Sequence, residues 1–175
     1  MIPQTIPSVI PITAPGGAGY VEAYPTVAAK VDIGAIDWGA VDNIKVDDGS
    51  WATADLLGLE TSDLLRCTHF NFAVPGGALI VGVEVIVHEV LLQAGNLYAQ
   101  LYVSGAGEGD VKVLPWAPTG NDYVIFGGPA IKWGAVLTAA KVNADNFGVQ
   151  LFAEETENAP KVYRCDSARV KVYYA

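Results

Sequence analysis

The chain has 175 residues, which favours one domain with ample length for a hydrophobic core. Its formal net charge is −9 and its 10 basic residues are scattered, so no basic patch can neutralise phosphates and nucleic acid is not an expected partner. Hydrophobic residues make up 51% of the chain and charged residues 17%, against about 25% charged in an average globular protein. Apolar surface in this excess is usually buried against another molecule, which favours a large interface between subunits.

A membrane-spanning helix is not expected. The most apolar run, residues 73–87, contains Pro75 and Glu84 and alternates, whereas a spanning helix needs about 20 largely apolar residues. No Lys or Arg precedes Lys30, so the basic start of a signal peptide is missing. We therefore expect no membrane partner and explain the apolar surplus by assembly into an oligomer.

Residues 1–19 are interpreted as an extended arm, followed by a single β-sandwich domain over residues 20–175. Proline recurs at every fourth position of the arm with isoleucines between, and no residue there is charged. Proline lacks a backbone donor and favours extended conformations, which argues against a helix or a central strand. We predict that the arm docks on a neighbouring subunit or on its own sandwich. Its candidate partner-binding residues are Ile2, Pro3, Ile6, Pro7, Ile10 and Ile12.

The strongest strand pattern lies at residues 70–89. A short strand over 70–74 is predicted to enter a Pro-Gly-Gly turn at 75–77 and to continue as a long strand over 78–89. Glu84 and His88 fall on one face of the long strand, and β-branched residues alternate on the other. Those residues are Val81, Val83, Val85 and Val87. We predict that this segment forms the central hairpin of the sandwich.

Shorter alternating segments supply the other strands. After one or two short strands within 20–46, the predicted strands are residues 51–57, 64–74, 97–103, 123–126, 147–153 and 168–174. The sequence also predicts a turn at 47–50, exposed loops at 105–110 and 154–160, and a helical turn at 137–143. About eight strands with little helix predict an all-β, antiparallel sandwich of jelly-roll type.

The two cysteines, Cys67 and Cys165, adjoin predicted strands. We interpret them as small buried hydrophobic residues of a protein assembled in a reducing cytoplasm. A disulfide between them requires that their strands be neighbours, which the sequence leaves open.

No catalytic constellation is apparent. Cys67 and His69 share one face of a strand, but nucleophile and base normally come from separate elements that meet in a cleft. No Gly-x-Ser-x-Gly motif occurs. The acidic side chains within 108–110 and 154–157 lie in predicted exposed loops, where carboxylates are ordinary surface charge. We therefore expect no catalytic residues and no cofactor.

Metal binding is expected to be absent as well. Two histidines without a Cys-x-x-Cys pair argue against zinc. Asp42, Asn43, Asp47 and Asp48 form an oxygen-rich cluster that calcium prefers in principle, but their spacing does not match a calcium loop. Asp and Asn before Gly are first of all turn residues. The interpretation is a turn, with a weak calcium site as the alternative.

The aromatic residues are interpreted mainly as core or interface anchors. A sugar-stacking platform is the alternative use of the four tryptophans and eight tyrosines. The tryptophans are Trp38, Trp51, Trp116 and Trp133.

Five consecutive segments resemble one family pattern. They are DDGSWATA at 47–54, FNFAVPGGALIVGVEV at 70–85, FGG and WG within 126–134, LTAAKVNADNFGVQL at 137–151, and DSARVKVYY at 166–174. In order and spacing they resemble small β-sandwich virion proteins of tailed bacteriophages, which decorate capsids or belong to tail structures. The resemblance implies turns at residues 48–49 and 75–77 and a core strand entered through residues 146–148.

The resemblance implies a structural virion role without catalysis. The expected function is capsid decoration: a cement protein, homotrimeric, that bridges subunits of the major capsid protein in a virion assembled in the host cytoplasm. A tail, baseplate or fibre component is the first alternative. A carbohydrate-binding module for host attachment is the second. A glycan-cleaving enzyme is the third, and the want of a convincing acid/base pair argues against it.

Overall fold

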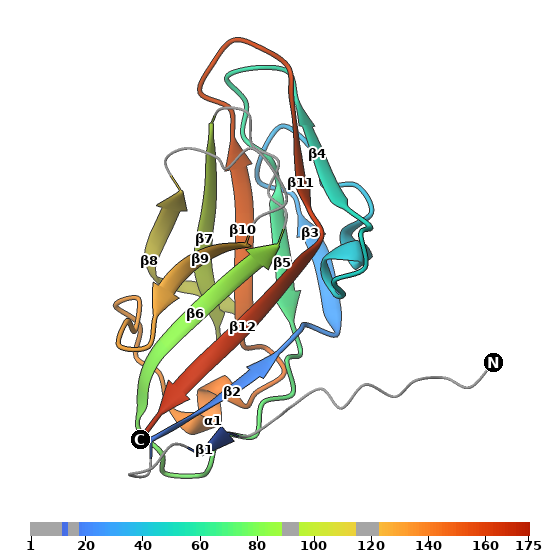
Figure 1. Cartoon of the computed structure of the whole chain (residues 1–175). Coiled ribbons are helices and arrows are strands. Elements are labelled where there is room, and N and C mark those ends of the chain that lie inside the picture. The colour runs from blue at the N-terminus through green and yellow to red at the C-terminus, as the bar shows by residue number, and fades with distance from the viewer. Residues whose placement is uncertain (1–11, 14–17, 89–94, 115–122) are drawn as a thin grey trace, which may run out of the picture.

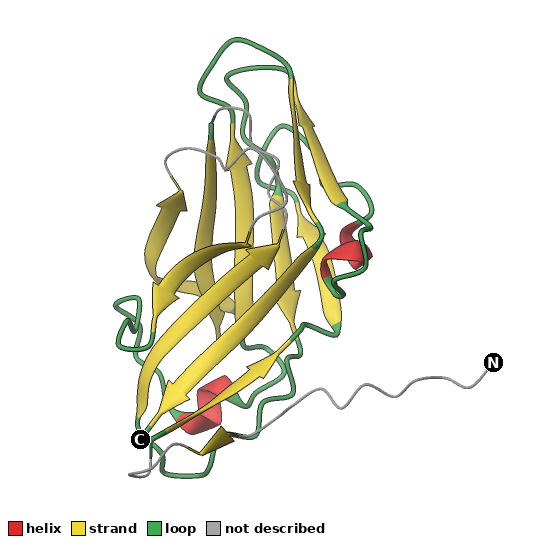
Figure 2. Ribbon diagram, viewed as in Figure 1, coloured by secondary structure: helices red, strands yellow, loops and turns green. Residues whose placement is uncertain are grey.

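The computed structural model describes the chain except for residues 1–11, 14–17, 89–94 and 115–122. Two five-stranded antiparallel sheets pack against each other, and the helices among these described residues are two short turns (Figure 2). The predicted all-β antiparallel sandwich is confirmed. In the described part no helix is long and apolar enough to cross a membrane.

The sheet nearer the viewer in Figure 1, called here the front sheet, has the order β1-β2-β12-β6-β9. Its strands are β1 (Ile12–Thr13), β2 (Gly19–Ala23), β12 (Ser167–Tyr174), β6 (Ile80–His88) and β9 (Tyr123–Gly128). The back sheet has the order β3-β5-β10-β7-β8. Its strands are β3 (Val27–Val31), β5 (Leu64–Thr68), β10 (Gly148–Glu154), β7 (Asn96–Val103) and β8 (Ala106–Leu114).

A two-stranded ribbon extends the sandwich at one end (Figure 1). It pairs β4 (Ala52–Leu56) with β11 (Lys161–Cys165). The chain passes from β11 into β12 through the single residue Asp166, so one strand leaves the ribbon as the next enters the front sheet. The two short helices are η1 (Val41–Ile44) and α1 (Ala139–Val142), the latter within the predicted helical turn and capped by Thr138.

Strand alternation builds the core between the sheets. Val83, Val85 and Val87 of β6 point inward and are fully buried, as predicted, whereas Glu84 and His88 lie on the opposite face and are half-buried. Val81 departs from the prediction and is half-buried, because the pairing of β6 with β12 shifts register and skips it.

The predicted central hairpin is wrong. β5 ends at Thr68 in the back sheet, β6 begins in the front sheet, and residues 70–74 form no strand between them. His69 and Asn71 have positive φ, which breaks the extended backbone, although Phe70, Phe72 and Val74 still alternate into the core. The segment crosses from one sheet to the other, and the Asn143 side chain bonds both backbone groups of Val74 in place of a strand partner.

Two further elements differ from the prediction. Residues 105–110, predicted as an exposed loop, lie mostly in β8, which makes a tight turn from β7 at Ser104 and Gly105. β11 was not predicted. Its outward-facing residues include Arg164 and it follows charged residues, so it resembles an exposed loop in the sequence. The turn at Pro75 is confirmed by the Ala78 N–H, which donates to the Pro75 carbonyl.

Both cysteines are free and fully buried, which confirms the interpretation of Cys67 and Cys165 as small core residues. Burial raises the pKa of both thiols, to about 12 for Cys165.

Candidate functional site

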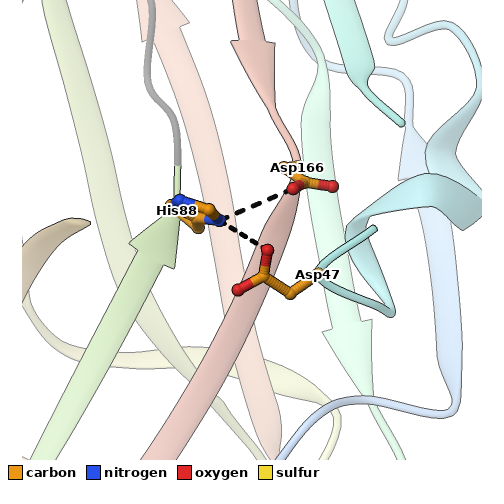
Figure 3. A group of neighbouring side chains, drawn as sticks. All are labelled: Asp47, His88 and Asp166. Carbon is orange, nitrogen blue, oxygen red and sulfur yellow. Dashed lines mark hydrogen bonds and ion pairs between the residues drawn. The ribbon is translucent and has the colours of Figure 1, made fainter. Parts of the chain in front are cut away.

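Three side chains from distant parts of the sequence converge at one end of the front sheet (Figure 3). Asp47 follows η1, His88 ends β6, and Asp166 joins β11 to β12. His88 Nδ1 lies 2.7 Å from Asp47 Oδ1 and 3.5 Å from Asp166 Oδ2. We call these three residues the Asp-His-Asp cluster.

Backbone pairing places the three side chains together. His88 lies opposite Ser167 in the β6–β12 ladder, and the N–H of Asp166 donates to the His88 carbonyl. Asp166 is almost fully buried, and its carboxylate accepts the backbone N–H groups of Asp48 and Gly49. The turn predicted at residues 47–50 therefore wraps around the Asp166 carboxylate and brings Asp47 to His88.

Tyr123 of β9 completes the surroundings of the cluster. Its ring stacks on the His88 imidazole with centroids 4.0 Å apart and an interplanar angle of 10°. Its hydroxyl donates to Asp47 Oδ2 at 2.8 Å. The side chains of Asp166, His88 and Asp47 are 2%, 13% and 29% exposed, so the cluster runs from the interior to the surface.

The electrostatics favour an ionised Asp47. Burial by itself raises the pKa of this carboxyl, but hydrogen bonds from Tyr123 and His88 and the charge of His88 outweigh burial and lower it. The hydrogen bond between Tyr123 and Asp47 raises the pKa of the Tyr123 hydroxyl. This hydroxyl therefore stays protonated and donates to the Asp47 carboxylate. At neutral pH Asp47 is therefore a carboxylate, and it lies beside the His88 ring.

The outer face of the front sheet continues from the cluster as a polar and aromatic surface. Tyr20 and Tyr173 pack with ring centroids 5.8 Å apart, and the Lys171 ammonium lies 4.5 Å from the centre of the Tyr20 ring. Arg169 pairs with Glu22 at 2.8 Å. Most charged side chains on this face form ion pairs with one another or cation–π contacts with its rings. The face therefore presents aromatic rings and has no strong electrostatic potential of one sign.

A different kind of surface follows β8 and β9, which end the two sheets on the same side of the sandwich (Figure 1). Large apolar side chains are exposed on the outer face of the back sheet at β8, on the outer face of the front sheet at β9, and on the segment that follows β9, reaching 71% exposure at Val136. We call these residues together the apolar rim. Its residues are Val111, Val113, Tyr123, Ile125, Ile131 and Val136.

The oxygen-rich cluster expected from sequence does not form one site. Asp42 pairs with Lys45, and Asp48 accepts the backbone N–H of Ser50, whereas Asp47 turns to His88. The link from Asp47 to His88 and Asp166 was missed, because sequence does not show that β6 and β12 are neighbours. The outward position of His88 in the strand pattern was the one signal available.

The other candidate residues from the sequence do not come together in one site within the described part of the chain. Trp38 and Trp133 are buried core residues with bonded indole N–H groups, which removes them from any sugar-stacking platform. Trp116 lies outside the described residues, as does most of the predicted arm, of which residues 12–13 and 18–19 are described. Of the loop carboxylates, Glu155 is buried and accepts a hydrogen bond from Tyr163.

No protein-family model matches the sequence. No curated protein matches it either. Among solved structures, the chain is similar to the enzymatically active domain of tailspike protein 4 from bacteriophage CBA120, with a TM-score of 0.39 and 10% sequence identity. The similarity covers 89% of this chain and 19% of that protein. It is a weak structural likeness to a phage tail protein, and it carries no argument about function.

This comparison corrects one expectation. Catalysis was expected to be absent, but the similar domain is described as enzymatically active, so the absence of catalysis is withdrawn for this chain. At this level of similarity no particular reaction is transferred to it.

Proposed function

We propose that this chain is a structural subunit of a tailed-bacteriophage virion, with capsid decoration as its leading placement and a tail, baseplate or fibre position as the alternative. The observation that carries the proposal is the apolar rim along β8 and β9. The ordered segments that resemble virion β-sandwich proteins support the same role.

The rim has the properties of a surface made for contact. Monomeric proteins usually guard edge strands with charge, proline or a covering element, because an unpaired strand edge invites association. Here the edge strand β9 exposes Tyr123 and Ile125, and β8 exposes two valines beside the Asp110–Lys112 ion pair. Full burial of such a side chain contributes about 1.5–3 kcal/mol, so covering the half-exposed rim contributes several kcal/mol before ordering costs.

The N-terminal arm fits the same proposal as a second contact. Ile2, Ile6 and Ile10 lie in an uncharged segment outside the described residues, and apolar surfaces of neighbouring subunits are what such a segment would bind. Binding to the assembled lattice, and not to its unfolded parts, would stabilise the shell by mass action. A homotrimer is the assembly we expect.

The first test measures the mass of the purified chain by light scattering after size exclusion. We expect a multiple of 18.4 kDa, three for a trimer, and conversion towards the monomer in Ile125→Lys. Val162→Lys is the matched control, since Val162 is similarly exposed but lies on β11, outside the rim. A monomeric wild-type chain at high concentration would overturn self-association through the rim.

The second test looks for the chain in virions of the phage that encodes it. Mass spectrometry of purified particles should detect the protein, and its absence would overturn the virion role. Separating heads from tails on a density gradient distinguishes the two placements. A chain lacking residues 2–15 should stay folded yet fail to bind heads if it is a cement protein.

A further inference from the structure

We propose that Asp47, His88 and Asp166 form a binding site for a divalent transition-metal ion of the zinc type. The sequence pattern predicts no metal, so this proposal departs from that expectation. It is also independent of the virion role, since it rests on the geometry of the cluster alone.

The spacing of the three ligand atoms fits one ion. Zinc binds imidazole nitrogen and carboxylate oxygen at about 2.0–2.2 Å, which places ligand atoms about 3.0 Å apart at right angles and about 3.4 Å apart in a tetrahedron. His88 Nδ1 lies 2.7 and 3.5 Å from the nearest oxygens of Asp47 and Asp166, and the three atoms lie within 4.8 Å of one another. Coordination would require the Asp47–His88 pair to open from 2.7 Å to about 3.0–3.4 Å.

The surroundings orient each ligand. The Tyr123 hydroxyl holds Asp47 Oδ2, which leaves Asp47 Oδ1 facing the imidazole. Two backbone N–H groups of the 47–50 turn bind the Asp166 carboxylate, and the Tyr123 ring fixes the plane of His88 by stacking. Metal ligands in proteins are usually held by outer hydrogen bonds of this kind.

The two carboxylates of the cluster also face one point. Asp166 is buried, and its Oδ2 lies 3.5 Å from the same imidazole nitrogen that Asp47 Oδ1 approaches to 2.7 Å. Within the described residues neither carboxylate forms an ion pair with Lys or Arg, because the nearby Arg169 pairs with Glu22. The experiment below distinguishes a metal ion at Nδ1 from a plain hydrogen bond between the imidazole and the carboxylates.

A second acidic group in the described chain provides a useful contrast. Asp32, Asp37 and Asp63 also lie close together, but Lys30 pairs with the first two and backbone N–H groups bind the third. That group has its cation already and offers no nitrogen ligand. The imidazole of the Asp-His-Asp cluster favours zinc over calcium or magnesium, which take oxygen ligands. With three protein ligands, at least one position remains for water or a partner's group.

The test titrates the EDTA-treated full chain with zinc chloride by calorimetry, with manganese and calcium chlorides for comparison. We expect one zinc ion per chain, bound more tightly than manganese or calcium. Long-range ¹H–¹⁵N spectra should show the Nδ1 signal of His88 move to the position of a metal-bound nitrogen as zinc is added. An unchanged His88 signal in saturating zinc would overturn the proposal.

Two variants and two controls complete the design. His88→Gln and Asp47→Asn should weaken zinc binding by more than about 100-fold, beyond the usual cost of losing an outer hydrogen bond. The amide introduced by Asp47→Asn can still accept from Tyr123, and circular dichroism verifies that both variants fold. His69→Asn and Asp42→Asn, outside the cluster, should bind zinc like the wild type. Equal zinc affinity in all four variants would refute the site.

Discussion

Replacing Asp166 by alanine should loosen the junction between the ribbon and the front sheet. The carboxylate accepts N–H groups of Asp48 at 3.3 Å and of Gly49 at 3.1 Å, and it faces His88 at 3.5 Å. A hydrogen bond to a charged group contributes about 1.5–3 kcal/mol. In the variant, the N–H groups of the turn regain part of this free energy by bonding water. We therefore expect Asp166→Ala to lower the free energy of unfolding by about 2–4 kcal/mol.

Urea unfolding followed by tryptophan fluorescence, in the presence of EDTA, measures this loss without any contribution from metal. Asp48→Ala is the matched control, since Asp48 makes only a local contact with Ser50 and should cost about 0.5 kcal/mol. Hydrogen exchange should accelerate in β4 and β11 more than in β10. A loss below about 1 kcal/mol in Asp166→Ala would refute the view that this carboxylate organises the junction.

Three further predictions concern the core and the acid limb of stability. Gly148→Ala should cost about 3 kcal/mol or more, because its Cβ would lie 1.9 Å from the Cys67 carbonyl oxygen, whereas Gly76→Ala has open space and should change the melting temperature little. Cys67 and Cys165 should resist a thiol reagent at pH 8 until urea unfolds the chain, because burial raises both thiol pKa values. Burial alone raises the pKa of Asp63, but two backbone N–H groups outweigh it and lower that pKa. Its stabilisation is therefore complete above the unfolded pKa of about 3.9 and is lost as the pH falls through the folded value, and Asp63→Asn should flatten that loss in acid titrations.

Strand positions could be predicted where one face of a strand is buried, because burial forces alternation with period two. This holds for the inward valines of β6, and for β7, β10 and β12. The same rule misled at Phe70 and Phe72, which alternate into the core without a strand partner. Alternation reports which side chains are buried, and backbone pairing needs the additional information that His69 and Asn71 adopt positive φ.

The Asp-His-Asp cluster was beyond sequence reasoning for a different reason. The turn at residues 47–50 and the outward position of His88 were both predictable from local rules. Their meeting depends on β12 lying between β2 and β6, a long-range pairing that brings Asp166 next to a residue 78 positions earlier. Local patterns place each side chain on its own element, and only sheet order brings the elements together.

The fold buries much of the apolar content that the composition shows. A large share of the apolar surplus is absorbed by the core, which takes the inner faces of both sheets together with Trp38, Trp133 and Tyr163. Composition alone therefore overstates the need for a partner. Assembly is indicated by where the exposed apolar side chains lie, and not by the total number of apolar residues. The rim places exposed apolar side chains on two strands that end their sheets. Because Ile125 is 59% exposed, Ile125→Lys should leave the unfolding free energy within about 0.5 kcal/mol while it alters self-association. A variant that unfolds the chain instead would show that the rim serves the fold and not a neighbour.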